Sequence, residues 1–175
     1  MSYIRRSLIL ICFFIVLALF MGDVSAASLN VTEIGLASEG VKNYTEANGN
    51  IPGYVEVADK NSSAPSFLKT LTKTAVQLNS GSTASVNISS VNGPTGPSGS
   101  ATGTLYKSEY VTVANNVYNY INSNGRAPNY ASSSLGNIRY ESLVYAYARI
   151  VNFYRVNVRL PDSVAISNIV GGALH

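Results

Sequence analysis

The stretch Asn124-Gly125-Arg126-Ala127-Pro128-Asn129-Tyr130 sets the organisation of this chain, because its pattern has already occurred as Asn48-Gly49-Asn50-Ile51-Pro52-Gly53-Tyr54. Placing Gly49 on Gly125 aligns the two stretches, and the same offset places Tyr44 on Tyr120 without a gap. Self-similarity at a fixed offset is the signature of an internal repeat. The chain therefore predicts two copies of one structural unit.

Each copy predicts a helix, a capped turn and a short extended arm. Gly49 and Gly125 end the helices, since glycine tolerates the left-handed conformation of a C-terminal cap. Pro52 and Pro128 follow shortly after, and proline cannot continue a helix. The chain must then leave as an extended arm that presents a tyrosine. The two arms are expected at residues 54–57 and 130–133.

The predicted fold is mainly α with short extended arms, built from two small repeated helix-turn-arm-helix units joined by a Ser/Gly/Pro-rich linker. Residues 30–88 form the degenerate first unit and residues 105–175 the second, better-formed unit. Residues 89–104 predict a flexible linker, since their composition cannot bury a core. Each unit further divides into two similar halves of about 33 residues. We expect residues 105–175 to fold alone.

Apolar residues at helical spacing predict four helices and their inner faces. The first runs from about Thr32 to Asn48, and Pro65 opens the second. Ser108 and Asn137 are the expected caps of the helices in the second unit. A short strand is expected within residues 85–88, where apolar residues alternate. Four tyrosines are expected to fill the core, namely Tyr110, Tyr120, Tyr147 and Tyr154.

Residues 1–26 have the pattern of a secretory signal peptide: basic residues, an apolar run and small residues before Ala27. The alternative is an uncleaved anchor, which would be the chain's membrane contact. Cleavage removes Cys12, Arg5, Arg6 and Asp23 and leaves ten Lys/Arg against eight Asp/Glu. That balance does not favour a nucleic-acid partner. The sequence therefore predicts a secreted protein.

No catalytic site, metal site or cofactor is predicted. Without the signal peptide the chain has no cysteine, and its single histidine is the terminal His175, so nucleophilic triads cannot be assembled. Metal-binding clusters of His and Cys are excluded for the same reason. A carboxylate pair of Glu109 and Glu141 stays open as an alternative, although acidic residues near helix N-termini have a simpler role against the helix dipole.

The excess of tyrosine indicates a carbohydrate or peptide-polymer ligand, since tyrosine joins an apolar ring to a hydrogen-bonding hydroxyl. Tyr54 and Tyr130 stand on the arms, outside the helical periodicity. Arg126 lies in the rigid turn, where a guanidinium can pair with a carboxylate through two parallel bonds. A solvated surface arginine is the simpler alternative for Arg126.

The second copy has the pattern Ala114-x-x-Val117-x-x-Tyr120-Ile121-x-x-Asn124-Gly125-Arg126-x-Pro128-Asn129-Tyr130, followed by an apolar helix at 143–151. This pattern resembles the pseudomurein-binding repeat. Such repeats occur in wall proteins of methanogenic archaea and in enzymes that cut pseudomurein. The chain departs from the family pattern at Ala127 and Ala131, and the first copy lacks the Arg. The expected ligand-binding residues are Asn124, Arg126, Asn129, Tyr130, Asn48 and Tyr54, and the structural turn residues are Gly49, Pro52, Gly125 and Pro128.

The resemblance implies a non-catalytic protein of the archaeal cell surface, secreted and associated with the cell wall, with pseudomurein as its partner. The peptidase domain found beside such repeats in the hydrolases is absent from this sequence. The alternative is a structural or adhesive surface protein whose Tyr-rich repeats bind a protein partner.

Overall fold

A computed structural model describes residues 28–171 of the chain as four helices with short paired strands. The predicted signal peptide lies outside the described residues. Within residues 28–171, none of the helices combines the length and the apolar character needed to cross a membrane. The helices are α2 (Val31–Asn48), α3 (Ala64–Asn79), α4 (Lys107–Asn124) and α5 (Tyr140–Asn157).

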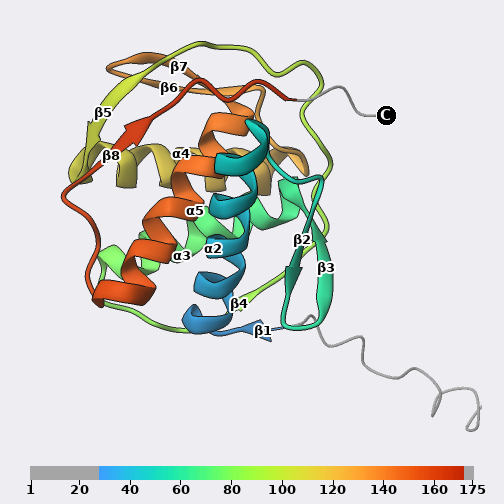
Figure 1. Cartoon of the computed structure of the whole chain (residues 1–175), viewed down its shortest axis with the longest axis vertical. Coiled ribbons are helices and arrows are strands. Elements are labelled where there is room, and N and C mark those ends of the chain that lie inside the picture. The colour runs from blue at the N-terminus through green and yellow to red at the C-terminus, as the bar shows by residue number, and fades with distance from the viewer. Residues whose placement is uncertain (1–27, 172–175) are drawn as a thin grey trace, which may run out of the picture.

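Each helix is flanked by short strands that pair in antiparallel fashion (Figure 1). The hairpin β2 (Tyr54–Val57) with β3 (Lys60–Ser63) joins α2 to α3, and the hairpin β6 (Tyr130–Ser133) with β7 (Gly136–Arg139) joins α4 to α5. The outer strands also pair, and these pairs are β1 (Ser28–Leu29) with β4 (Val86–Asn87) and β5 (Gly103–Tyr106) with β8 (Ser163–Ile166). The predicted fold class and arms are confirmed.

Local capping chemistry determines where the helices of the first unit begin and where α2 and α4 end. Asn30 and Glu33 form a reciprocal capping box at the start of α2. Gly49 (φ 73°) and Gly125 (φ 65°) end α2 and α4 in the left-handed conformation, as predicted. Pro65 lies in the first turn of α3, also as predicted.

The predicted caps of the second unit are wrong, because each of its helices follows directly on a strand. Helix α4 begins at Lys107, immediately after β5, so Ser108 is already within the helix. Strand β7 pairs with β6 through residue 139, so Asn137 is in the strand and α5 begins only at Tyr140.

The two units share one hydrophobic core. Helix α2 packs against α5, and α3 packs against both α4 and α5, so the helices of each unit lie on those of the other (Figure 1). One cluster of buried side chains includes Ile34 and Phe67 from the first unit and Ile121 and Ile150 from the second. This interlocked arrangement differs from the expected pair of separately folding units.

The segment 89–104, which we call the surface strap, is tied to both units and differs from the expected free linker. Val91 is buried and donates its backbone N–H to Ser66 Oγ at 3.0 Å. Asn92 exchanges backbone hydrogen bonds with the turn after α4, donating to Gly125 O and accepting from Ala127 N. The composition of the strap does not require a free chain, because backbone hydrogen bonds can hold a segment that buries few side chains.

The expectation that four tyrosines fill the core holds for two of them. Tyr110 and Tyr147 are buried, and their hydroxyls donate at 2.7 Å to the carbonyls of Pro161 and Tyr110 respectively. Tyr154 is only partly buried. The prediction for Tyr120 is wrong: the side chain is 42% exposed, because its place on α4 borders the solvent beside β6.

Candidate functional site

A groove of about 410 Å³ runs between α4 and the arm β6 in the second unit. Helix α4 contributes Asn116, Val117 and Tyr120, and the arm contributes Tyr130 after the turn proline Pro128. The groove exists because the chain, once α4 has ended at its glycine cap, is redirected by the proline to run beside the same helix.

A second groove of about 590 Å³ occupies the corresponding place in the first unit, between α2 and β2. Its Tyr44, Pro52 and Tyr54 are related to Tyr120, Pro128 and Tyr130 by the offset of the repeat. The groove of the first unit is the more acidic of the two, and the acidic residues that line it are Glu33, Glu56 and Asp59. The duplication therefore extends from the fold to a surface feature.

Both grooves present a pair of tyrosines to solvent, one from the helix and one from the arm. The exposed fractions are 43% for Tyr44 and 73% for Tyr54, and 42% for Tyr120 and 43% for Tyr130. Large aromatic rings that stay exposed beside a proline are suited to stacking on a ligand, with hydroxyls free to hydrogen-bond. Tyr54 and Tyr130 thus lie where the sequence predicts, and sequence reasoning missed Tyr44 and Tyr120.

The structure gives Asn48 and Asn124 a capping contact. Asn48 Nδ2 donates to Tyr44 O, and Asn124 Nδ2 donates to Tyr120 O, each at 2.8 Å. These bonds provide a partner for a carbonyl in the last turn of the helix, where intrahelical donors run out. Asn157 repeats the contact with Phe153 O at 2.9 Å at the end of α5.

Asn129 borders the groove, and its side chain holds the surface strap. Its Oδ1 accepts hydrogen bonds at 2.9 Å from the backbone N–H groups of Thr95 and Gly96. The first unit has Gly53 at this position, which offers no side chain for such a contact. Arg126 lies on the turn, outside the set of residues that line the groove, and within residues 28–171 it forms no ion pair.

The two carboxylates that the sequence left open as a catalytic pair hold parts of the fold together. Glu109 accepts hydrogen bonds from the N–H and hydroxyl of Ser134, at 2.6 and 2.9 Å, and Glu141 pairs with Arg139 at 2.9 Å. The two carboxylates of the alternative carboxylate site thus have separate partners. Among residues 28–171, no group of three or more His, Cys, Asp or Glu is arranged to hold a metal ion.

Comparison with known families finds a match over part of the chain. A family model described as the pseudomurein-binding repeat matches residues 101–133 and again residues 134–166. The first match spans β5, α4 and β6, and the second spans β7, α5 and β8, so one repeat is a strand-helix-strand element. None of the curated proteins matches the chain.

Proposed function

Residues 101–166 are two pseudomurein-binding repeats, and from this premise we propose that the chain is a secreted, non-catalytic protein that holds to the cell wall through its two tyrosine-lined grooves. The repeats imply binding to pseudomurein and association with the cell surface. The observation that supports the grooves as the binding sites is their recurrence, with Tyr44 and Tyr54 in one unit and Tyr120 and Tyr130 in the other.

The proposed contact is stacking of a sugar or peptide segment between the helix tyrosine and the arm tyrosine. Each ring offers an apolar face and a hydroxyl, which suits a polymer that alternates apolar faces with polar groups. Two grooves on one interlocked core engage the same polymer at a high effective concentration, which raises the overall affinity above that of either groove. In this proposal the prolines and capping residues position the rings.

The experiment that tests the proposal is sedimentation of residues 27–175 with purified, protein-free pseudomurein, beside bacterial murein as the comparison polymer. We expect retention on pseudomurein and its loss in the double variant Tyr54→Ala/Tyr130→Ala. Tyr106→Ala is the matched control, since Tyr106 is 68% exposed and lies outside both grooves. No retention on protein-free pseudomurein would favour the alternative of a protein partner.

A further inference from the structure

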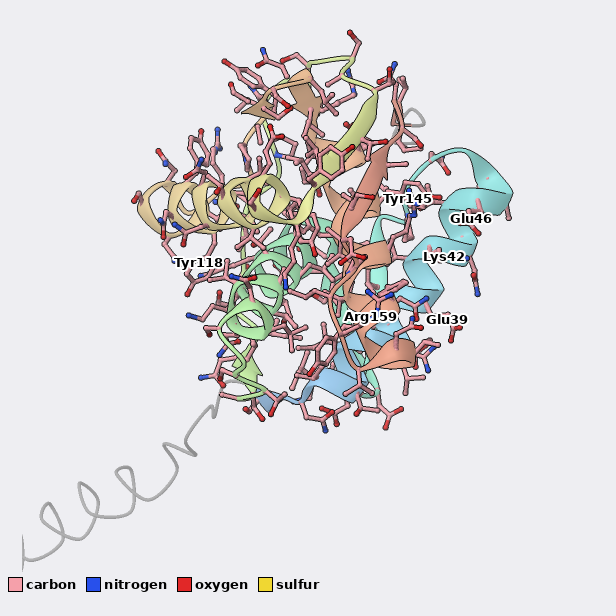
Figure 2. All side chains as sticks on the ribbon, turned by 90° about the vertical axis from the view of Figure 1, so that its left-hand side faces the viewer. Glu39, Lys42, Glu46, Tyr118, Tyr145 and Arg159 are labelled. Carbon is pink, nitrogen blue, oxygen red and sulfur yellow. The ribbon has the colours of Figure 1, made fainter. Side chains whose placement is uncertain are left out.

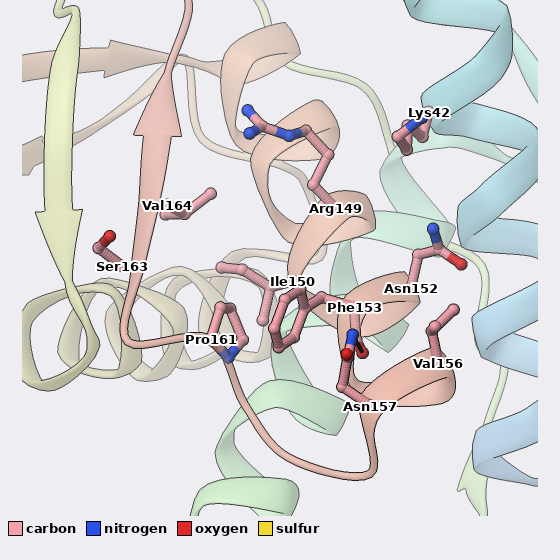
Figure 3. Close-up of a pocket in the computed structure, with 10 residues that line it drawn as sticks. All are labelled: Lys42, Arg149, Ile150, Asn152, Phe153, Val156, Asn157, Pro161, Ser163 and Val164. Atoms are coloured by element: carbon pink, nitrogen blue, oxygen red, sulfur yellow. Dashed lines mark hydrogen bonds between the residues drawn. The ribbon is translucent and has the colours of Figure 1, made fainter.

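The two halves of the second unit are themselves copies of one repeat. We count the halves of the first unit as the first and second repeats, and call residues 101–133 the third repeat and residues 134–166 the fourth. The fourth repeat carries a groove of its own, about 310 Å³ in volume, between α5 and β8 (Figure 3). Placing residue 101 on residue 134 puts Phe153 at the position of Tyr120 and Ser163 at that of Tyr130. The groove therefore keeps the helix aromatic and loses the arm aromatic, so its chemistry must differ from that of the two tyrosine-lined grooves.

The cation Arg149 stands in this groove at the position that Asn116 has in the third repeat. Its Nη1 donates to Ala165 O at 3.0 Å, and its guanidinium lies 5.2 Å from the centre of the Tyr145 ring. Within residues 28–171 it pairs with no carboxylate. A guanidinium has five donors in a fixed fork, so this one keeps donors for an anionic ligand.

A second cation reaches the same groove from the other unit. Lys42, on α2, lines it together with Arg149 and Asn152 of α5. Figure 3 shows Lys42 on the neighbouring helix and the Arg149 side chain extending from α5 on the β8 side. Lys42 also pairs with Glu46 at 2.8 Å, which leaves Arg149 as the groove's uncompensated charge.

The first unit repeats this arrangement at the offset that places Gly49 on Gly125. A groove of about 390 Å³ beside α3 and β4 is lined by Lys73, which corresponds to Arg149, and by Tyr118 of α4, which corresponds to Lys42. Lys73 Nζ lies 5.0 Å from the centre of the Tyr118 ring. In Figure 2, Lys42 and Tyr118 lie on opposite sides of the molecule, as expected for two separate grooves. Both grooves thus hold a cation close to a tyrosine ring.

We propose that the grooves of α3 and α5 bind carboxylate groups of the wall polymer, while the tyrosine-lined grooves of α2 and α4 bind its uncharged parts. This assignment rests on the proposed wall-binding function and adds a charge preference to it. The recurrence of a cation at Lys73 and Arg149 carries the assignment, because the two residues occupy one position in both units. The carboxylate can belong to a sugar acid or to a peptide.

The test compares wall binding of residues 27–175 over a series of salt concentrations. The variants are Arg149→Gln, Lys73→Gln and their combination, with Lys107→Gln as a charge-matched control that is exposed and outside the grooves. Arg149→Lys retains the positive charge. We expect the double variant to bind about tenfold more weakly, as for loss of a charge-assisted hydrogen bond, with a flatter dependence on salt. Arg149→Lys should recover most of the binding.

Two soluble probes identify the source of the carboxylate by NMR titration: an oligogalacturonate and an acetylated glutamate peptide. Shifts in the amide signals around Arg149 with either probe, lost in Arg149→Gln, support the proposal and name the source. The proposal is overturned if the wild type binds the wall and the double variant binds equally well at every salt concentration. It is also overturned if neither probe shifts those signals. Failure of the wild type to bind the wall would instead overturn the proposed function.

Discussion

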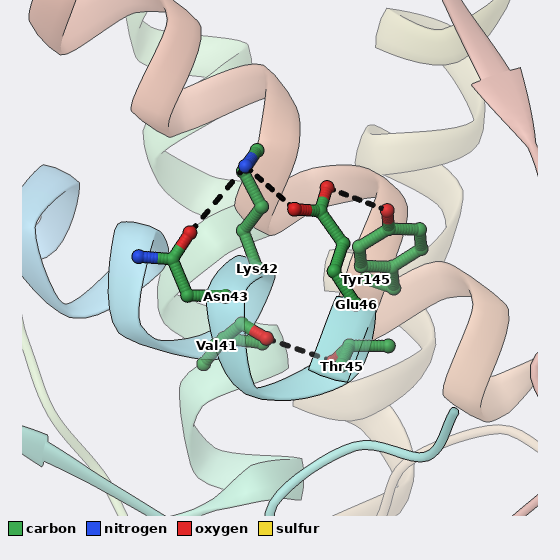
Figure 4. A network of polar contacts seen from close by, with 6 residues as sticks. All are labelled: Val41, Lys42, Asn43, Thr45, Glu46 and Tyr145. Atoms are coloured by element: carbon green, nitrogen blue, oxygen red, sulfur yellow. Dashed lines mark hydrogen bonds and ion pairs between the residues drawn. The ribbon is translucent and has the colours of Figure 1, made fainter. Parts of the chain in front are cut away.

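Tyr145 of α5 donates its hydroxyl to Glu46 of α2 at 3.1 Å, across the boundary between the two units (Figure 4). Lys42 holds the same carboxylate at 2.8 Å, and its hydrogen bond lowers the pKa of Glu46 below the usual value. Burial raises the pKa of Tyr145, so the phenol keeps its proton and acts as the donor. The contact joins a helix of the unmatched first unit to the fourth repeat.

The shared core predicts that residues 105–175 do not fold cooperatively by themselves. Removing the first unit exposes the faces of α4 and α5 that pack on α3 and α2. We expect the fragment to show weak helicity and no sharp thermal transition by circular dichroism, or to associate into dimers that restore the packing. Residues 28–171 serve as the control. A monomeric fragment that melts in one sharp transition would show that the second unit has an independent core.

Val158→Gly is expected to stabilise the protein. Val158 ends α5 with φ 54°, the left-handed conformation that Gly49 and Gly125 adopt at the ends of α2 and α4. A β-branched residue in that region costs about 1–2 kcal/mol, and the entropy of glycine in the unfolded chain offsets part of the gain.

We therefore expect a net gain of about 0.5–1 kcal/mol in the free energy of unfolding, measured by urea denaturation. Val158→Ala is the control, because alanine keeps the Cβ that causes the strain. If the alanine variant is the more stable of the two, the left-handed cap is not what limits stability here.

Alkaline pH is expected to unfold the protein through its buried tyrosines. Burial raises the pKa values of Tyr110, Tyr140 and Tyr147 above the ordinary value near 10. The folded state therefore holds these protons more tightly than the unfolded state, so the stabilisation is complete below about pH 10 and declines as the pH rises further.

Each of these tyrosines should then contribute a loss of about 1.4 kcal/mol per pH unit above that point, or roughly 4 kcal/mol for the three together. Phenolate absorbance and helicity, followed along one pH titration, provide the measurement. We expect part of the phenolate signal to appear only together with the loss of helicity. Ionisation of all tyrosines while helicity persists would contradict the expected burial.

The repeat offset predicted the parts of the fold that local chemistry controls. Glycine caps and turn prolines mark the ends of α2 and α4 and the starts of β2 and β6, and these were confirmed. The partner strand β3 was missed, because Lys60–Ser63 has no apolar alternation and is a strand only through its pairing with β2. Helical periodicity cannot tell which helices pack together, so the interlocked core was also missed.

Only two of the four tyrosines that line the grooves were predicted as candidates from the sequence. A tyrosine just after a turn proline falls outside the helical pattern, so Tyr54 and Tyr130 were predicted as candidates. Tyr120 fits the inner-face periodicity of α4, but it lies at the edge of that face, which borders the groove and not the core. Lys73 became a candidate only when the structure placed it and Arg149 in equivalent grooves.

Tyr120→Ala should weaken wall binding and leave stability nearly unchanged. The Tyr120 ring is half-exposed in the groove, so its removal takes away a ligand contact and little core packing. An aromatic anchor of this kind contributes about 1–3 kcal/mol to binding when it stacks on its ligand. Sedimentation with pseudomurein measures the first effect and thermal unfolding the second.

Tyr147→Phe is the matched variant in the core, where the hydroxyl donates to Tyr110 O at 2.7 Å. Its loss leaves a buried carbonyl with one partner fewer, which should reduce the free energy of unfolding by about 0.5–1.5 kcal/mol without changing wall binding. Within the second unit, Tyr120→Ala therefore tests the ligand contact and Tyr147→Phe tests the contribution of the core. Should Tyr120→Ala lower stability as a core truncation does, by about 3–5 kcal/mol, then the ring packs against the protein and the groove needs another anchor.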